Sequence, residues 1–404
     1  MQFIQTVFLS VVPFLLVLGI VVTVHELGHF LAAKAFGTKI DRFSIGFGRA
    51  IASWTDKSGV DWRIGWLPVG GYVRFAGDDN AASIPDAEDL AGMRRELVSQ
   101  GRGDEIDRYF HFKPIYQRAI IAAAGPVANF LLAITIFAVL LSALGEWVVP
   151  ARIATVVPNS AAMAAGFQPG DLIVRANGRK IARFDDIAEV VSVRANVPVQ
   201  FVVKRGDREV VLTGTPRWQM RTDPVGGAQR VGTLGIIPAQ TADDYVNVRY
   251  NPIEAVQRGT QRTWHTLETT VYYLGRMITG QVNADQLRGP LGIATVTKNV
   301  ATLGADSSQG FFEIVSRSSL NLLQLVAVLS VSIGFMNLLP VPVLDGGHLM
   351  FYAYEAVFRR PLAAKVQAAG YRVGLALVLG LMLFATWNDL QRLNVFKLFG
   401  GLFS

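Results

Sequence analysis

The fold is decided by residues 14–29, which read FLLVLGIVVTVHELGH. From Met1 to Val24 the chain has no charged residue, and an apolar run of this length can cross a bilayer, because about 20 such residues span its hydrocarbon core. No basic residue precedes the run, so it lacks the pattern of a cleaved signal peptide. We therefore predict that residues 1–36 form a first, retained transmembrane helix.

The polar motif at the end of this run indicates a metal site. His25 and His29 are four residues apart, so on a helix both imidazoles face the same side, and imidazole nitrogen is a common zinc ligand. Glu26 stands beside the first of them, where a carboxylate can act as a general base toward water. The alternative is that the histidines are ordinary core or interfacial residues. Burying these residues at the end of a span without a ligand is costly, so we favour zinc.

The composition of the whole chain lies between two classes. Of its 404 residues, 51% are hydrophobic and 17% are charged, and the net charge is +7. This is too apolar for an ordinary soluble protein and too charged for a compact bundle of membrane helices, so we expect transmembrane helices with a water-soluble insert. The chain has no cysteine, so its zinc ligands must be histidine or carboxylate side chains.

Further apolar runs predict three more spans. The second transmembrane helix is predicted at 119–145 and the third at 316–347. Residues 348–404 are predicted to form a cytoplasmic loop, the fourth transmembrane helix and a tail. Segment 37–118 is rich in Lys and Arg, which marks it as cytoplasmic and puts the amino terminus outside. The third run then ends in Asp345 at the depth of the first motif. Two histidines and a carboxylate with an open fourth position form a catalytic zinc set, so we expect His25, His29 and Asp345 to share one zinc ion.

Segment 37–118 also contains two stretches rich in aromatic, β-branched and glycine residues, at 43–48 and 62–75. They predict a β-hairpin, followed by linkers and a surface helix. The hairpin is either a plain cytoplasmic sheet or an element that reaches the site and offers an edge to an extended substrate. In the second case, Gly70-Gly71-Tyr72 is the predicted substrate contact.

Residues 146–250 change to short β-rich runs separated by turn residues. The runs lie at 148–157, 172–176, 199–204 and 209–214, with a helical segment at 184–193. The stretch 162–173, followed by Asn177-Gly178 and this helical segment, resembles a PDZ domain of the bacterial protease-associated type, a module that binds extended peptide ends by strand addition. After it, 251–315 is predicted as an amphipathic helix and linker. The helix, at 251–280, either lies on the membrane surface or packs against the spans.

Two polar residues each keep two interpretations. Asn129, in the second span, either hydrogen-bonds between helices or belongs to the site. His348 follows Asp345 by three residues, and it either supports the site or is unrelated to it.

Together these motifs resemble the site-2 protease family, and within it the bacterial regulator of sigma-E protease branch. The resemblance covers nearly the whole chain in order, through residues 25–29, 70–73, 124–126 with Asn129, the PDZ segment, 288–293 and 337–347. It implies intramembrane zinc proteolysis, with His25, His29 and Asp345 as metal ligands and Glu26 as catalytic base. It also implies that Asn337 holds the substrate backbone and that Pro340 and Pro342 form a loop beside it. The enterobacterial form has tandem PDZ domains, whereas this chain has room for one.

The predicted fold is a polytopic α-helical membrane protein with about four transmembrane helices, a cytoplasmic-side β-hairpin region and an inserted extracytoplasmic α+β PDZ domain. We expect it in a bacterial inner membrane, with the amino terminus and the PDZ domain periplasmic and the active site near the cytoplasmic side. Its predicted substrates are single-span membrane proteins, such as an anti-sigma factor, or signal-peptide remnants, cut after a first extracytoplasmic cleavage.

The other predicted partners are the lipid bilayer and peptide ends at the PDZ domain, with no nucleic acid. Two alternatives use the same residues: a zinc transporter or sensor, and a PDZ-bearing scaffold without activity. Glu26 argues against both alternatives, because neither needs a base beside the metal.

Overall fold

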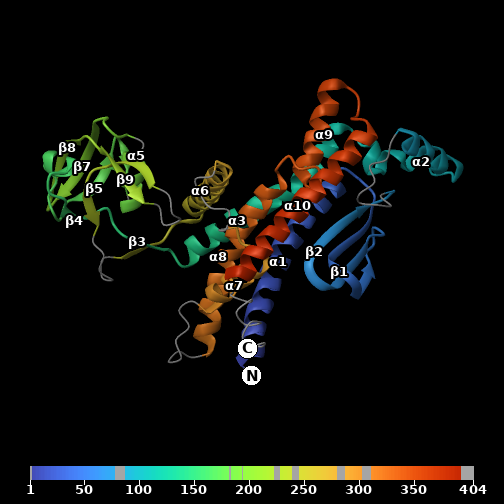
Figure 1. Cartoon of the computed structure of the whole chain (residues 1–404), viewed down its shortest axis with the longest axis horizontal. Coiled ribbons are helices and arrows are strands. Elements are labelled where there is room, and N and C mark those ends of the chain that lie inside the picture. The colour runs from blue at the N-terminus through green and yellow to red at the C-terminus, as the bar shows by residue number, and fades with distance from the viewer. Residues whose placement is uncertain are drawn as a thin grey trace. The chain divides into compact units, whose positions relative to one another are not determined.

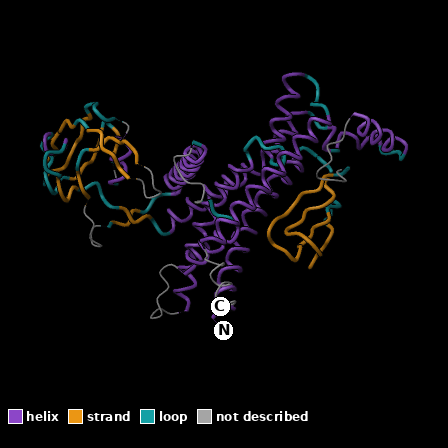
Figure 2. The backbone as a smooth tube through the Cα atoms, viewed as in Figure 1, coloured by secondary structure: helices purple, strands orange, loops and turns teal. Residues whose placement is uncertain are grey.

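The computed structural model describes residues 2–77, 87–181, 183–192, 194–222, 228–238, 245–279, 287–302 and 311–392 (Figures 1 and 2). The chain divides into two compact units. The first comprises Met1–Phe137, Val256–Leu274 and Asn283–Ser404, and the second comprises Ala138–Ala255 and Gly275–Val282. Part of the predicted linker in 37–118 and the tail beyond residue 392 lie outside the described residues.

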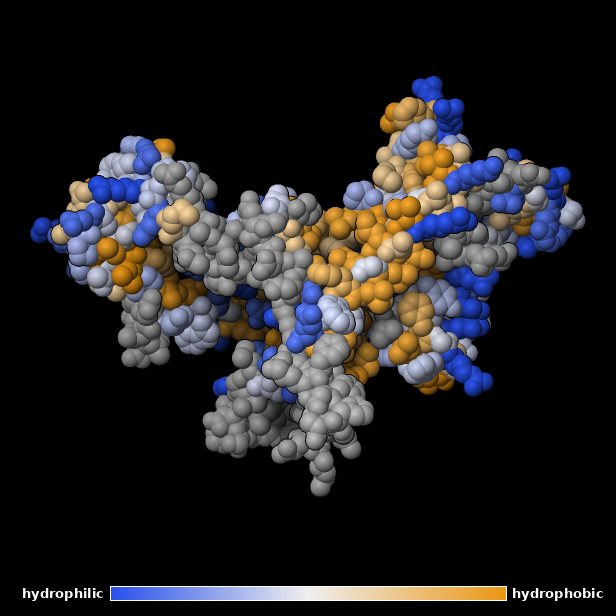
Figure 3. Space-filling model, viewed as in Figure 1, coloured by the Kyte–Doolittle hydropathy of each residue, from blue (hydrophilic) through white to orange (hydrophobic). Residues whose placement is uncertain are grey.

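Four helices among the described residues are long and apolar enough to cross a membrane, by length and composition. They are α1, Gln2–Ala35; α3, Ile115–Ala143; α8, Phe311–Asn337; and α10, Ala364–Arg392. Hydrophobic side chains gather over these helices (Figure 3). The number agrees with the predicted four spans.

The third span is shorter than the predicted segment 316–347. Helix α8 ends at Asn337, because Pro340 and Pro342 lack the backbone N–H that a continuing helix needs. After a short connection the next helix, α9, Asp345–Phe358, begins. Asp345 is therefore the first residue of a new helix and not the end of a span, and α9 occupies part of the region predicted as a cytoplasmic loop.

Two more helices lie in the region 251–315. Helix α6, Pro252–Ile278, confirms the predicted helix, and the guanidinium of Arg262 lies 5.9 Å from the ring centre of Phe137 in α3, so α6 contacts a span. Helix α7, Pro290–Thr302, was not predicted. It packs against α1, α8 and α10.

The predicted hairpin is present as β1, Ile40–Thr55, and β2, Asp61–Phe75. The register shifts along both strands, so that the first part of β1 pairs with residues 61–64 on one side and with residues 71–75 on the other. In the pairing of the described residues, 71–75 has a partner on one side only. This segment is therefore an edge of the small sheet, and helix α1 packs against β2.

Aromatic rings join the hairpin to α1. The ring of Phe30 lies 5.4 Å from Phe43 and 5.2 Å from Trp62, measured between ring centres. The polar segment that follows the hairpin contains the predicted surface helix. Its elements are α2, Ala87–Ser99, and the 3-10 helices η1, Gly103–Arg108, and η2, Phe110–Phe112.

The second unit is an α+β domain around a four-stranded sheet of order β6-β5-β7-β8. Three two-stranded pairs, β9–β10, β4–β11 and β3–β12, accompany this sheet. The buried core takes Ile173, Phe201 and Val203 from the sheet and Ile187 from α5. The predicted run 148–157 is two strands rather than one, with a break around Pro150, which cannot donate to a strand ladder.

In chain order its elements are β3, Glu146–Val148; β4, Ile153–Val156; α4, Ala161–Ala164; β5, Leu172–Ala176; β6, Arg179–Lys180; α5, Phe184–Ser192; β7, Val199–Arg205; β8, Arg208–Gly214; β9, Arg217–Thr222; β10, Ala228–Thr233; β11, Ile236–Pro238; and β12, Val246–Val248.

Candidate metal centre

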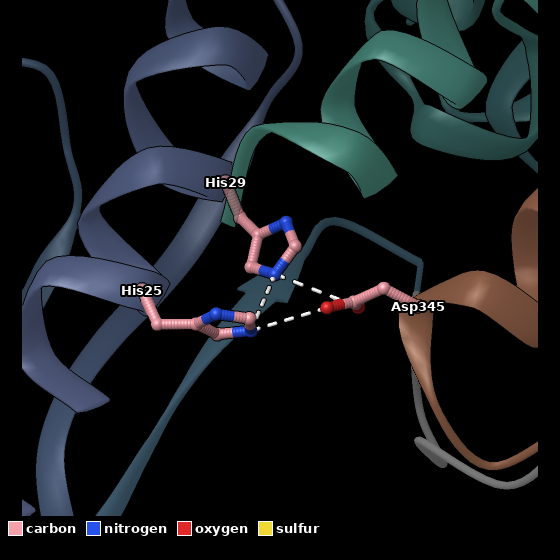
Figure 4. Close-up of side chains that lie close together, drawn as sticks. All are labelled: His25, His29 and Asp345. Atoms are coloured by element: carbon pink, nitrogen blue, oxygen red, sulfur yellow. Dashed lines mark hydrogen bonds and ion pairs between the residues drawn. The ribbon is translucent and has the colours of Figure 1, made fainter. Parts of the chain in front are cut away.

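Helices α1 and α9 bring three metal-ligand side chains together. His25 and His29 project from one face of α1, and Asp345 faces them from the first turn of α9 (Figure 4). The Nε2 of His25 lies 3.1 Å from one carboxylate oxygen of Asp345, and the Nε2 of His29 lies 3.6 Å from the other. All the ligand atoms lie within 4.8 Å of one another, and among the described residues this is the group that can hold a metal ion.

The chemistry of this donor set suits a cation. The two Nε2 atoms are 3.2 Å apart, so both can direct a lone pair at the same point when each ring carries its proton on Nδ1. A carboxylate closes the third side of the gap, and His25 is 7% exposed. A cation among the three groups satisfies both lone pairs and the negative charge at once. Two imidazoles and one carboxylate leave a fourth tetrahedral position for water or substrate.

Close backbone packing puts Asp345 in this position. Gly346 and Gly347 are buried, and a Cβ on them would meet the backbone carbonyls of Leu338 and Val341. The connection after α8 therefore folds directly over the start of α9. On the other side of this connection, the ring of Pro342 packs against Gly370 and Gly374 of α10.

Helix α3 shapes the site from the opposite side. The Nδ1 of His29 donates to the backbone carbonyl of Ile121 at 2.8 Å, which leaves the Nε2 lone pair free for a metal. A Cβ on Gly125 would meet the Nε2 of His29 and would lie 2.9 Å from the Cε1 of His25. The absence of a side chain at residue 125 therefore keeps the space beside the ligand atoms open.

The candidate base lies where the hairpin meets α1. Glu26 is half-buried, and its carboxylate accepts a hydrogen bond from the backbone N–H of Val73. A Cβ on Gly71 would lie 3.1 Å from the Cγ of Glu26. The edge segment 71–75 and Glu26 are therefore in direct contact.

The predicted substrate-binding residues divide into two groups. Asn337 belongs to the metal centre, because its Nδ2 lies 3.2 Å from the Nε2 of His25. Gly71 contacts Glu26, as described above. Gly70 and Tyr72 instead pack against Phe47, and the Tyr72 and Phe47 rings stack with their centres 6.3 Å apart.

The two predicted prolines and His348 are not among the three candidate ligands. Pro340 is exposed, and Pro342 is half-buried against α10. The Nε2 of His348 and the hydroxyl of Tyr371 share a hydrogen bond of 2.7 Å, which ties α9 to α10. His348 is not among the side chains that converge on the candidate metal position in the described part of the chain.

Sequence reasoning did not find two contributors to this site. Gly125 has no side chain that could signal a role, although its spacing from Asn129, four residues on, puts both on one face of α3. The carbonyl of Ile121 is a backbone atom, so no residue type could have revealed it. Both become visible only when α3 is packed against α1.

Comparison with known proteins identifies the family of the chain. The sequence model of peptidase family M50 matches residues 13–381. Metalloprotease MmpA of Caulobacter vibrioides is 50% identical over 396 residues, covering 98% of this chain and 99% of that protein. A candidate zinc metalloprotease of Agrobacterium fabrum is 42% identical over 383 residues, covering 95% and 96%. Among solved structures, the PDZ domain of the SdrC-like protein from Listeria monocytogenes matches at 19% identity and a TM-score of 0.18, covering 23% of this chain and 87% of that one.

The family match extends over most of the chain, and both relatives align over almost their full lengths. The resemblance to site-2 proteases is confirmed, and with it the prediction of a zinc-dependent membrane metalloprotease. The chain belongs to peptidase family M50.

Proposed function

We propose that this protein cleaves the transmembrane segments of single-span proteins inside the membrane. One observation carries the proposal: His25, Glu26 and His29 lie on a helix that is itself long and apolar enough to span a bilayer. A peptidase centre built on such a helix lies within the membrane, so the polypeptide that reaches it is also in the membrane. The substrate must therefore be a membrane segment, and not a soluble polypeptide.

In this proposal His25, His29 and Asp345 hold one zinc ion per chain. When bound, zinc acidifies water and polarises the scissile carbonyl. Glu26 takes a proton from the attacking water and delivers it to the nitrogen of the leaving amine, so that the peptide bond is replaced by a carboxylic acid and an amine. The hydrogen bond from Val73 keeps the Glu26 carboxylate oriented toward the hairpin edge.

The hairpin edge supplies a place for an unwound substrate. A peptide bond in a helix has its N–H and carbonyl engaged, so a transmembrane substrate must unwind before it is cut. Its freed backbone groups then need partners, because each costs several kcal/mol if left bare in lipid. Apart from the Val73 N–H, which Glu26 accepts, the one-sided segment 71–75 offers backbone groups to an added strand, and Asn337 offers an amide at the metal centre. Gly70, Tyr72, Pro340 and Pro342 shape the two sides of this path.

Charge distribution supports an orientation for the chain. The basic segment 37–118 favours the cytoplasmic side of a bacterial inner membrane, with the amino terminus and the second unit periplasmic. The site then lies near the cytoplasmic side. We assign the second unit as a PDZ domain that binds peptide ends outside. The substrates are single-span proteins already cut there once, such as an anti-sigma factor, or signal-peptide remnants.

Replacement of Glu26 by Gln tests the catalytic assignment. Glu26→Gln removes the base and keeps the three proposed ligands, so zinc content is expected to stay near one per chain while cleavage of a single-span substrate in proteoliposomes is lost. Glu209→Gln, an exposed change in β8, is the matched control and is expected to cut normally. Cleavage by Glu26→Gln at the wild-type rate would contradict the proposed mechanism.

Metal analysis tests the ligand assignment separately. Asp345→Ala and His25→Ala are expected to purify without zinc, because each removes one of three protein ligands. His265→Ala, at an exposed position of α6, is expected to retain it. Full zinc occupancy in Asp345→Ala would show that another residue supplies the third ligand.

A further inference from the structure

Asn129 is a fully buried polar residue in the middle of an apolar helix. It has no exposed surface, and its Nδ2 lies 3.3 Å from the Nδ1 of His25. Its side-chain oxygen has no hydrogen-bond partner among the described residues. A buried amide oxygen without a partner costs free energy, so this arrangement calls for an explanation.

The protonation pattern of His25 supplies the explanation. A metal on the Nε2 of His25 takes the lone pair of that atom, so the single ring proton must sit on Nδ1. Nδ1–H then needs an acceptor, and the group that faces it is the Asn129 amide. The oxygen and nitrogen of an amide have nearly the same shape, and a half-turn of the side chain exchanges them. With the oxygen facing His25, the ring proton on Nδ1 has an acceptor, and the amide NH₂ takes the place that the oxygen had.

The position of Asn129 on α3 supports the same conclusion. Ile121, Gly125 and Asn129 are spaced by four residues and share one face of the helix. Along this face, Ile121 accepts from His29, Gly125 leaves room for both rings, and Asn129 meets His25. The Nδ1 atom of each histidine therefore faces a group of α3, a backbone carbonyl at His29 and the Asn129 side-chain amide at His25.

We propose that Asn129 is a positioning residue of the metal centre: its side-chain oxygen accepts the hydrogen bond of His25 Nδ1–H and holds that ring with Nε2 directed at the metal. The inference rests on the zinc site proposed above. Partners of this kind fix the orientation and tautomer of a ligating histidine, and their loss costs about 10- to 100-fold in metal affinity.

A second contact of Asn129 separates this role from simple helix packing. The hydroxyl of Ser330 in α8 donates to the backbone carbonyl of Asn129 at 2.9 Å. This bond joins α3 to α8 and does not involve the Asn129 side chain. Ser330→Ala therefore weakens the helix contact and leaves the partner of His25 in place, which makes it the matched control.

The test measures zinc affinity of the full-length protein in detergent by competition with a chelator. Asn129→Leu has no acceptor and is expected to bind zinc about 10- to 100-fold more weakly than wild type. Asn129→Asp keeps an acceptor oxygen and is expected to bind at least as tightly as wild type, and Ser330→Ala is expected to match wild type. Wild-type affinity in a folded Asn129→Leu protein would overturn the proposal.

A measurement on the unaltered protein covers the case in which Asn129→Leu does not fold. The chain has five histidines, so ¹⁵N-histidine labelling with His25→Ala as the assignment reference can identify the His25 signals. In the zinc-loaded protein the Nδ1 of His25 is expected to be protonated and hydrogen-bonded. An unprotonated Nδ1 would overturn the role of Asn129 while leaving the zinc site intact. Failure of the wild-type protein to bind zinc would instead overturn the proposed function.

Discussion

Gly125 is the residue on which the two histidine rings depend for space. Its missing Cβ leaves room at the Nε2 of His29 and the Cε1 of His25. Interiors are packed too tightly for a methyl group to be added at such a point without displacing its neighbours. A single carbon atom at this position would therefore displace the histidine rings that are proposed to bind the metal.

Gly125→Ala tests this competition. Alanine is the better helix former, so α3 is expected to remain folded, while zinc occupancy and peptidase activity fall together. Gly380→Ala is the matched control, because it changes a glycine in another apolar helix where a Cβ meets nothing within 4 Å. Zinc content by elemental analysis and helicity by circular dichroism decide the result. Normal zinc content in Gly125→Ala would mean that the rings can shift to make room.

Site residues that a local sequence pattern indicates could be predicted, and those that depend on packing between distant helices could not. His25, Glu26 and His29 fall within about one helical turn, so helical periodicity alone put the two rings on one face. Asp345 lies far along the chain, and the run of apolar residues before it supplied the prediction. The residues that surround the two rings come from α3. Which face of α3 turns toward α1 depends on tertiary packing, and no short stretch of sequence indicates it.

At the scale of elements, the edge strand and the end of α8 lie on two sides of the same centre. Segment 71–75 contacts Glu26, and Asn337 contacts His25. Under the proposed function, a substrate strand held between them would have partners for its backbone on one side and an amide on the other. A mutation in these elements can therefore affect the unwinding of the substrate as well as the chemical step.

Asn337→Leu is expected to slow cleavage of a fully helical transmembrane substrate more than cleavage of the same substrate with Gly or Pro near the scissile bond. The second substrate is already partly unwound, so it needs less help from the amide. The measurement is kcat/KM for the matched pair of substrates in proteoliposomes. Equal losses for both would assign Asn337 to the fold or to the chemical step.

In the second unit, a buried ion pair joins the start of β5 to β7. The side chain of Asp171 is fully buried, and its carboxylate oxygens accept hydrogen bonds from Arg205 at 2.8 Å. Burial raises the pKa of Asp171, but the hydrogen bonds from Arg205 and from the Gln168 N–H outweigh it and hold the pKa below its ordinary value. The ionised form therefore contributes to the stability of the folded domain.

Asp171→Asn is expected to destabilise this unit by about 2 kcal/mol near pH 7, since it removes hydrogen bonds to a charged group. The pKa is lowered on folding, so the contribution is present above the unfolded value of about 3.9 and is lost as the pH falls through the folded value. Hydrogen exchange of β5 and β7 in the intact protein, measured from pH 7 downward, is expected to show the difference shrinking. Asp207→Asn, at an exposed turn, serves as control.

For the whole molecule, the transmembrane helices could be predicted from the sequence because a bilayer restricts which residues can cross it. A span needs a long apolar stretch with few charges, so it can be recognised from the local amino-acid composition. The four long helices therefore agree with prediction in number. Helix α7 was not predicted, because it is short and its packing against α1, α8 and α10 depends on contacts between distant parts of the chain. The end of α8 was predicted too late, since the prolines after Asn337 act a few residues upstream of where they stand.

Most of the second unit can be removed at a natural junction. Strands β3 and β12 pair directly, with Val148 opposite Val246, so the two ends of residues 149–245 lie side by side. Replacing those residues with Asn-Gly, which suits a two-residue hairpin, is expected to leave a folded protein that still binds zinc. Under the proposed function it cuts substrates that have not been trimmed outside, as well as trimmed ones. Loss of all cleavage in this folded, zinc-bound protein would make the domain part of the catalytic machinery.

The same pair of strands has an evolutionary consequence. A domain that enters and leaves through two adjacent antiparallel strands can be gained, lost or duplicated in one in-frame event, because the flanking chain keeps its direction and end-to-end distance. Recombination at such a stem exchanges the module and spares the codons of the peptidase. If the variant without residues 149–245 is active, genes with different numbers of inserted domains can be reached from this one through functional intermediates.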